Sequence, residues 1–319
     1  MLPVLALDRL DLDELREACH DIGFFYVSGH GVDQELCARV LELSRRFFEL
    51  PLEERESIDH IHSPQFRGYT RLADERTNGV RDQREQIDLG ADREALDLAA
   101  GDPAYMRLQG PNLWPPALPE LQGAVEPWLD QMGVLGHRLL RAIAASLGLD
   151  EDLFEPAFAE LPHVHAKIIR YPGVDSAGGD QGVGAHKDYG FLSLLMLEPG
   201  SAGLQAEGPD GTWIDAPPVD GTFLVNLGEM LEVATDGYLR ATVHRVVSPP
   251  AGSDRISVPY FFNPRLDATV ERVRLPPELA AEAEGAAADD TLSETYGVNA
   301  LRGWVRAHPE VAARHYPSE

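Results

Sequence analysis

His186 and Asp188, separated by one residue, form the first pair whose side-chain types and spacing suggest chemistry. The pair lies at the predicted end of a strand. Side chains at positions i and i+2 leave a strand on the same face, so the imidazole and the carboxylate can converge on one ion. The spacing alone does not establish a metal site, because a hydrogen-bonded pair at the protein surface gives the same pattern.

His244 is a second candidate ligand, in the apolar, strand-like run of residues 241–247. In isolation it is interpreted as a core histidine that bonds to the backbone. If it faces His186 and Asp188 across a barrel, two imidazoles and one carboxylate fill one face of an octahedron, which is typical of non-haem Fe(II) oxygenases. Structural zinc would require four protein ligands, usually including cysteine, and the chain has no Cys-x-x-Cys motif.

Arg255 and Ser257 follow in an alternating run, which places both on one face of a strand and apolar side chains on the other. A guanidinium that points into a barrel needs an anion, and its forked donors fit a carboxylate. A salt bridge at the rim is the alternative for this motif on its own. In a chain of formal net charge -26, a fixed cation downstream of a candidate iron site is better explained as the seat of a dicarboxylate.

These side chains need a framework of short strands, which the sequence predicts from residue 163 onward. The hydrophobic period changes there from 3.6 to 2 residues. Strands are predicted at residues 163–170, 191–197, 203–207, 212–216, 222–227 and 255–262, with a hairpin turn at 208–211. Many short strands between Gly, Pro and Asp predict a sandwich or jelly-roll barrel rather than an alternating βαβ sheet.

Helical patterns flank this predicted barrel. A long amphipathic stretch at residues 118–147 predicts a scaffold helix, and shorter patterns predict helices at 12–22 and 36–47. The tail, residues 292–316, returns to helical spacing and is expected to pack on the outside of the barrel. Residues 65–116 are polar and poorly periodic, so loops and short irregular elements are expected there.

Composition and charge limit the classes of protein to consider. The 319 residues, 44% of them hydrophobic, are enough for one large domain or two small ones. The charge of -26 disfavours a nucleic-acid partner, since such binding gains affinity from Lys and Arg. No apolar run approaches the roughly 18 to 20 residues of a membrane span. Without a recognisable secretory leader, the expected location is the cytoplasm. Nothing in the sequence indicates the oligomeric state.

The order of the motifs resembles the isopenicillin N synthase-like branch of the 2-oxoglutarate- and Fe(II)-dependent dioxygenases. The resemblance covers roughly residues 2–270. The segments that carry it are His186-x-Asp188, His244, Arg255-x-Ser257, residues 260–264 (Tyr-Phe-Phe-Asn-Pro), residues 23–32, residues 66–69 and the Asn-Leu-Gly-Glu-Met-Leu stretch at 226–231.

The resemblance implies an α+β chain with a double-stranded β-helix (jelly-roll) core, in which His186, Asp188 and His244 bind iron. It also implies that Arg255 and Ser257 hold the distal carboxylate of 2-oxoglutarate. Tyr171 matches a family tyrosine near the cosubstrate, or is simply an aromatic residue at a strand end. The implied division is an N-terminal region at 1–115 that is not independent, a scaffold helix and catalytic core at 116–270, and a C-terminal helical extension at 271–319.

The implied activity is the oxidation of a small metabolite by Fe(II), 2-oxoglutarate and O2, with release of succinate and CO2. Hydroxylation, desaturation and ring closure all remain open. One alternative is an Fe(II) oxidase or oxidative cyclase of the isopenicillin N synthase type, which takes all its electrons from the substrate. Another is a jelly roll that binds a metal or ligand without turnover.

Two residues depart from the family pattern: Lys187 stands between the first two ligands, where it would affect the pocket rim, and Glu229 stands where aspartate is common. By analogy, substrate contacts are expected at residues 66–71, at 165–167, at Phe261 and on the C-terminal tail. A structural role is the alternative for each of them.

Overall fold

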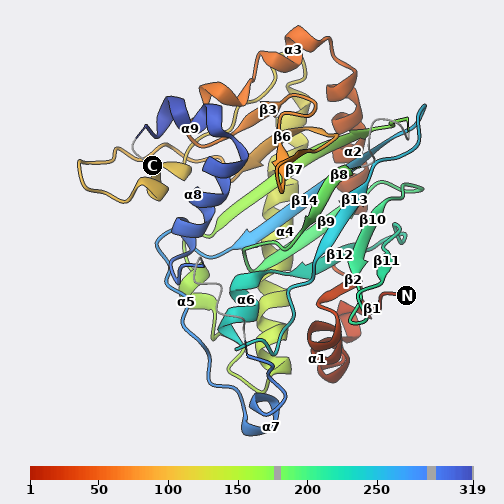
Figure 1. The fold of residues 1–319 in the computed structure, drawn as a ribbon, viewed down its shortest axis with the longest axis vertical. Coiled ribbons are helices and arrows are strands. Elements are labelled where there is room, and N and C mark those ends of the chain that lie inside the picture. The colour runs from red at the N-terminus through yellow and green to blue at the C-terminus, as the bar shows by residue number, and fades with distance from the viewer. Residues whose placement is uncertain (176–180, 286–291, 318–319) are drawn as a thin grey trace.

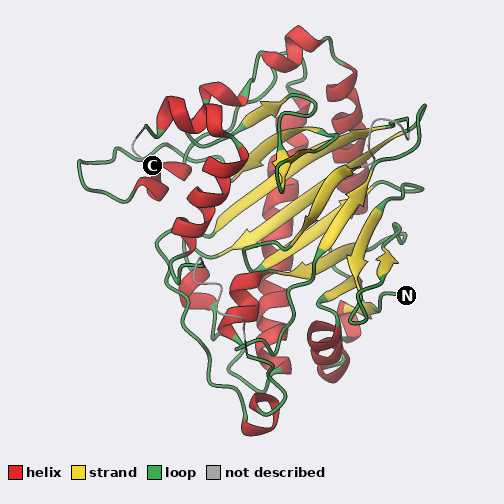
Figure 2. Ribbon diagram, viewed as in Figure 1, coloured by secondary structure: helices red, strands yellow, loops and turns green. Residues whose placement is uncertain are grey.

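Two β-sheets packed face to face form the centre of the molecule in the computed structural model, which describes residues 1–175, 181–285 and 292–317 (Figures 1 and 2). The large sheet has the order β1-β2-β12-β9-β14-β7-β6-β3, and all neighbouring strands are antiparallel except β1 and β2. The small sheet has the order β11-β10-β13-β8.

The strands of the large sheet are β1 Val4–Ala6, β2 Phe24–Ser28, β12 Phe223–Leu227, β9 Leu192–Leu197, β14 Asp254–Asn263, β7 His163–Pro172, β6 Glu85–Gly90 and β3 Gly68–Thr70. Those of the small sheet are β11 Trp213–Asp215, β10 Leu204–Glu207, β13 His244–Val247 and β8 Gln181–His186. A separate hairpin pairs β4 Arg76–Thr77 with β5 Val80–Arg81.

The two sheets share one apolar layer, to which alternate residues of each strand contribute. Tyr171 and Leu195 come from the large sheet, and Leu204 and Val246 from the small one. The predicted turn at 208–211 joins β10 to β11. The expected α+β fold with a double-stranded β-helix core is confirmed.

The large sheet rests on the scaffold helix α4 Glu120–Ser146, which lies behind the sheet in Figure 1. Trp128 of α4 packs edge to face on Tyr260 of β14. Gly136 is needed at the crossing, because a Cβ there would come within 2.6 Å of the Phe262 ring. This helix therefore holds β14, and with it the Arg255 motif, in a fixed position.

The other helices are α1 Leu12–Asp21, α2 Gln34–Glu49, α3 Leu52–Glu56, α5 Glu155–Phe158, α6 Glu229–Ala234, α7 Pro277–Ala280, α8 Tyr296–Ala307 and α9 Pro309–His315, with 3-10 turns η1 Leu7–Arg9, η2 His60–His62 and η3 Ala104–Leu108. Among the described residues, no helix combines the length and apolar character that crossing a bilayer requires.

The expectation of only loops and short irregular elements at 65–116 was wrong for β6. All six residues of this strand are buried, and it pairs with β7 inside the large sheet. Its buried residues include Glu85, Gln86 and Asp88, whose side chains bind other charged and polar groups. A strand buried on both faces that carries carboxylates has no hydrophobic period to detect.

The tail forms two helices rather than one, because Pro309 disfavours helical backbone in the residue before it. His308 accordingly adopts φ -130° and ψ 68° and separates α8 from α9. The expected packing on the outside is also incomplete, since α8 contributes Gly303 and Trp304 to the lining of the main cavity. The domain boundaries at 115/116 and 270/271 stay predictions, although β1, β2, β3 and β6 all belong to the large sheet.

Candidate active site

The structure brings together the three residues expected to bind a metal. His186 ends β8 and lies opposite His244, the first residue of β13, in the register of the small sheet. Asp188 follows β8 by two residues, with Oδ1 3.7 Å from His186 Nε2 and Oδ2 3.9 Å from His244 Nε2. One potential ligand atom from each residue lies within 4.8 Å of the other two. The three donors therefore converge on a single point.

Backbone carbonyls orient both imidazoles. Nδ1 of His186 lies 2.8 Å from the carbonyl oxygen of Gly184, and Nδ1 of His244 lies 3.0 Å from that of Thr242. A proton on Nδ1 forms the hydrogen bond to each carbonyl. The lone pair of Nε2 is then free to bind a metal ion. Burial, followed by the nearby His244, lowers the pKa of His186 to about 4, which favours the neutral form that binds metals.

The stretch 226–231 holds the aspartate. Asn226 Nδ2 donates to Asp188 Oδ2 over 2.8 Å, and Ser193 Oγ donates to the same oxygen. The backbone N–H of Glu229 donates to the Asp188 carbonyl over 2.8 Å. A Cβ on Gly228 would come within 2.2 Å of the carbonyl oxygen of Gly190, so only glycine permits this close approach.

The ionisation of Asp188 also suits a cationic ligand. Burial raises its pKa, but His244, His186 and the hydrogen bonds from Ser193 and Asn226 outweigh burial and bring the pKa below its ordinary value. Two imidazoles and one carboxylate, with no further His, Cys, Asp or Glu grouped with them among the described residues, fit an Fe(II) centre that keeps open positions.

Asn226→Ala is expected to weaken Fe(II) binding by about 10- to 100-fold, the range for residues that orient metal ligands. Its amide fixes the carboxylate of Asp188, so removing it frees that side chain to rotate. Fe(II) affinity measured by anaerobic dialysis checks this. Asn112→Ala, at a buried amide that bonds to Gly90, is the matched control and should keep the affinity of the unmodified protein.

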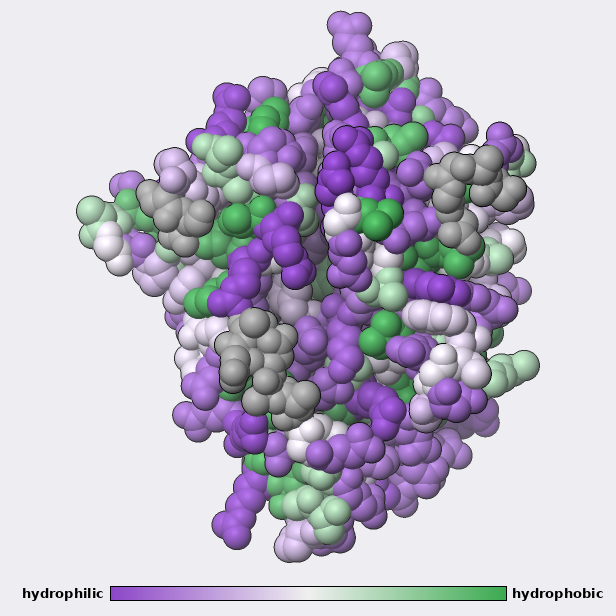
Figure 3. Space-filling view, viewed as in Figure 1, coloured by the Kyte–Doolittle hydropathy of each residue, from purple (hydrophilic) through white to green (hydrophobic). Residues whose placement is uncertain are grey.

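A cavity of about 460 Å³ adjoins the three donors. Figure 3 shows the face on which it opens, with hydrophilic residues around a central hollow. Arg255, Ser257 and Tyr171, the residues that the family resemblance places near the cosubstrate, are among those that line the cavity. Arg255 and Tyr171 are partners across β14 and β7, and the guanidinium lies over the Tyr171 ring, 4.9 Å from its centre.

Arg255 is a buried cation that makes no ion pair with any residue that the structure describes. The residue is 2% exposed, Nη1 donates to the carbonyl oxygen of Ala202, and Nε has no hydrogen-bond partner. Burial lowers the pKa of Arg255, so the charge is poorly solvated where it stands. A buried charge of this kind is favourable only when paired. The pocket thus fits an anion such as a terminal carboxylate.

The cavity is also lined by part of a charged network that sequence analysis missed in part. Lys167 Nζ lies 3.0 Å from Glu75 Oε1 and 3.2 Å from Asp88 Oδ1. Arg84 pairs with Glu75 and with Asp82. Glu75 and Arg84 line the cavity but stand in the polar region expected to be loops, where no periodicity marks them.

The expected substrate-contact segments have mixed outcomes. His165, Lys167, Phe261 and residues of the C-terminal helix α8 line the cavity. Residues 66–71 are not among its lining residues: Phe66 stacks on Trp304, and Arg67 is buried with Nη1 bonded to the carbonyl oxygen of Leu89. Lys187 does reach the cavity, where it pairs with Glu232 over 2.9 Å.

Comparisons with known proteins agree with this geometry. Residues 3–117 match the family model "non-haem dioxygenase in morphine synthesis N-terminal", and residues 163–264 match the "2OG-Fe(II) oxygenase superfamily". A homoarginine-6-hydroxylase of Glycine max is 39% identical over 81% of this chain and 78% of its own length. The 2-oxoglutarate-dependent dioxygenase frbJ of Dothideomycetidae sp. is 33% identical over 96% of this chain and 88% of its own. A full-length Neurospora crassa protein, solved in complex with α-KG and 5-formyluracil, superimposes with a TM-score of 0.75, at 26% identity, over 95% of this chain and 96% of that one.

Proposed function

This chain belongs to the 2-oxoglutarate- and Fe(II)-dependent oxygenase superfamily, and we propose that it hydroxylates a small amino acid that carries a guanidinium or another cationic side chain. As a member of this family it uses Fe(II), 2-oxoglutarate and O2, and releases succinate and CO2. In the proposal, His186, Asp188 and His244 hold the iron.

Bound iron and 2-oxoglutarate supply the oxidising power, since decarboxylation of the oxo acid and oxidation of a substrate C–H bond each provide two of the four electrons that O2 accepts. The protein positions the cosubstrate and the substrate relative to the iron. Arg255 and Ser257 hold the distal carboxylate of the cosubstrate, and Tyr171 supports the guanidinium of Arg255. The unpaired buried Arg255, beside three convergent metal donors, is the observation that carries this assignment.

The choice of a cationic substrate is supported by the charged groups that line the cavity around Glu75. Three buried carboxylates, Glu75, Asp82 and Asp88, are linked through ion pairs with Arg84 and Lys167. Burial lowers the pKa of His165 to about 4, so this histidine adds no positive charge near neutral pH. Of these three carboxylates, Glu75 is the one that lines the cavity, where it can face a cationic group of the substrate.

Other lining residues suit the remaining groups of such a substrate. Trp304, Phe261 and Tyr189 offer aromatic surface, which attracts cations. Arg306 is exposed at the cavity and makes no ion pair with any described residue, so it is available for a substrate carboxylate. The Glycine max relative has homoarginine hydroxylation in its name.

Succinate formation tests the proposed function. The protein is incubated aerobically with Fe(II), 2-oxoglutarate and one candidate from a panel of homoarginine, arginine, lysine and neutral or acidic amino acids. Cationic members should stimulate succinate formation and gain one oxygen atom by mass spectrometry. An oxidase of the isopenicillin N synthase type would oxidise its substrate without succinate, and stimulation only by acidic or neutral compounds would refute the cationic class.

Glu75→Gln is expected to raise the KM for the cationic substrate at least tenfold, because one buried ion pair contributes more than about 1.4 kcal/mol. Substrate-independent decarboxylation of 2-oxoglutarate should change little. Arg306→Met, at an exposed position, should also raise this KM without affecting folding. Glu271→Gln, at an exposed carboxylate that does not line the cavity, is the control. An unchanged KM in both cavity variants would place substrate recognition elsewhere.

We also infer a cytoplasmic location and no nucleic-acid partner. Support comes from the two free, buried cysteines, Cys19 and Cys37, and from the net charge of -26. Fractionation of the source cells would test the location.

A further inference from the structure

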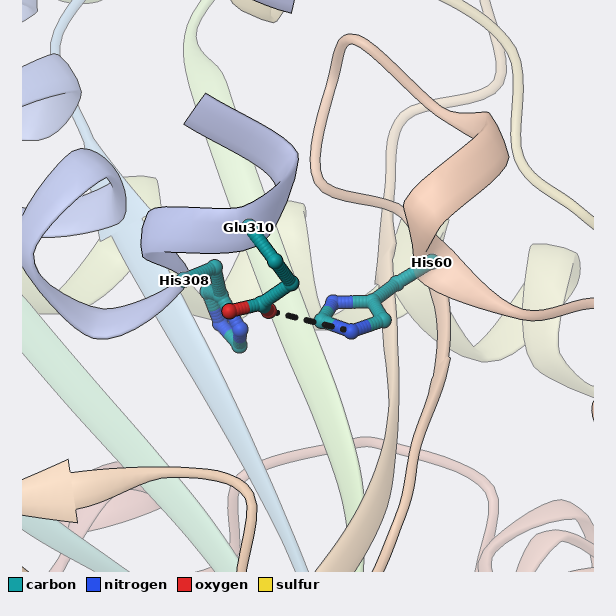
Figure 4. A group of neighbouring side chains, drawn as sticks. All are labelled: His60, His308 and Glu310. Carbon is teal, nitrogen blue, oxygen red and sulfur yellow. Dashed lines mark ion pairs between the residues drawn. The ribbon is translucent and has the colours of Figure 1, made fainter. Parts of the chain in front are cut away.

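A second group of potential metal donors lies where the C-terminal helices meet the N-terminal segment. His60 belongs to η2, His308 stands between α8 and α9, and Glu310 lies in the first turn of α9. One potential ligand atom from each residue lies within 4.8 Å of the other two. Figure 4 shows the Glu310 carboxylate directed toward the two imidazoles.

Hydrogen bonds within the described chain do not fully account for the His60 ring. His60 is 5% and His308 1% exposed; His60 Nδ1 has no hydrogen-bond partner among the described residues, and His308 Nε2 lies 3.0 Å from Glu75 Oε1. The remaining contact, from His60 Nε2 to Glu310 Oε1, is 3.5 Å, which is long for a hydrogen bond. Burial lowers the pKa of His60, so its ring is a neutral potential ligand rather than a firm ion-pair partner.

We propose that His60, His308 and Glu310 bind one Zn(II)-class ion, with water in the remaining position. Two ligands at about 2.0–2.1 Å in a tetrahedral site are roughly 3.3–3.4 Å apart, close to the 3.5 Å between His60 and Glu310. Glu310 is about half exposed, which gives an ion access from solvent.

Glu75 provides the support that a ligating histidine needs. Metal-bound histidines commonly donate their second N–H to a carboxylate. Glu75 Oε1 lies 3.0 Å from His308 Nε2, so it can hold this nitrogen while Nδ1 serves the ion. Glu75 also lines the main cavity, and the adjoining Trp304 stacks with His308. An ion at this position would therefore hold α8 against the cavity.

A competing location shares His308 but is less suitable. Glu75, Asp88 and His308 also lie close enough to hold an ion. These carboxylates are already paired with Lys167, and Glu75 with Arg84 as well. A divalent ion there would face two permanent cations at short range, which opposes binding.

Co(II) and Zn(II) titrations of the full-length His186→Ala/Asp188→Ala variant test the proposal, because that variant removes two of the three active-site donors. It should bind one equivalent of either ion, with Co(II) giving the intense visible bands of a four- or five-coordinate site. His60→Asn and, separately, Glu310→Gln should each weaken binding at least tenfold. His62→Asn, at an exposed histidine in the same turn, should leave the affinity unchanged.

Two results would overturn the proposal. One is the absence of any stoichiometric binding in the His186→Ala/Asp188→Ala variant. The other is binding that survives both His60→Asn and Glu310→Gln, which would place the ion at the group of Glu75, Asp88 and His308 or elsewhere. Because Glu310 is exposed, its substitution is compatible with folding, and the result does not depend on any hydroxylase activity.

Discussion

The His186→Ala variant is expected to lose more than about 100-fold of its Fe(II) affinity and its hydroxylation rate at limiting iron. Residues that merely orient metal ligands contribute about 10- to 100-fold, and His186 is one of only three proposed protein donors. Its side chain is one-third exposed at the end of β8, so truncation leaves no sealed cavity and folding should be preserved. Anaerobic Fe(II) dialysis and succinate formation measure the two effects.

His62→Asn serves as the control for this experiment, because it removes an exposed imidazole that does not line the main cavity. It should keep both the affinity and the rate. If His186→Ala bound Fe(II) as tightly as the unmodified protein, the assignment of the triad would be wrong, however well its three side chains converge.

The triad shows which parts of a site can be predicted from sequence. The i, i+2 spacing of His186 and Asp188 is a local property of an extended chain, so their common direction follows from the strand itself. The same holds for Arg255 and Ser257, which line the cavity as their alternation predicted. His244 was different, because its position opposite His186 depends on how β13 pairs with β8. Only the order of motifs in a known family suggested that pairing.

The proposed substrate contacts could not be predicted in the same way. Glu75 and Lys167 are separated by 92 positions in the chain. The pairing of β6 with β7 places Asp88 opposite Lys167, and Glu75, just before β4, reaches the same lysine from a segment without a periodic pattern. β6 itself has no hydrophobic pattern in the sequence, because its buried carboxylates pair with cationic side chains on other segments. Arg67 illustrates the opposite error, since a basic residue near the expected barrel mouth turned out to bond to the backbone of Leu89.

The C-terminal tail lies between these cases. Its helical spacing was visible, and Pro309 was an available signal that the helix would break at His308. What the spacing could not tell was the direction of Trp304, which packs on Phe66 and also lines the cavity. An amphipathic pattern predicts which face is buried, not what it is buried against.

Arg255→Met is expected to raise the KM for 2-oxoglutarate by roughly 100-fold, while kcat at saturating cosubstrate falls much less. Loss of one partner of a buried, hydrogen-bonded charge pair costs about 3 kcal/mol, and each 1.4 kcal/mol corresponds to a factor of ten in affinity. The KM of Arg255→Lys for 2-oxoglutarate should lie between those of the unmodified protein and Arg255→Met, because lysine keeps the charge but lacks the forked donors. Succinate formation at varied 2-oxoglutarate concentrations gives these constants.

Arg245→Met is the matched control for Arg255→Met. Arg245 lies on the small sheet, bonds to Gln205 and stacks over Trp213, and it does not line the cavity. Its removal should leave the KM for 2-oxoglutarate unchanged. If Arg255→Met instead raised only the KM of the organic substrate, Arg255 would seat that substrate's carboxylate, as an oxidative cyclase requires.

Stability separates the role of Arg255 as an anion seat from a structural one. In the absence of 2-oxoglutarate, Arg255 is a buried cation with no ion-pair partner among the described residues, so replacing it with the apolar methionine should raise the free energy of unfolding. With saturating 2-oxoglutarate the unmodified protein should have the higher free energy of unfolding, because only it gains the full binding energy of the cosubstrate. Urea unfolding of both proteins, with and without cosubstrate, measures this crossover. A variant that is less stable under both conditions would mean that the guanidinium is already balanced by the fold and is not waiting for an anion.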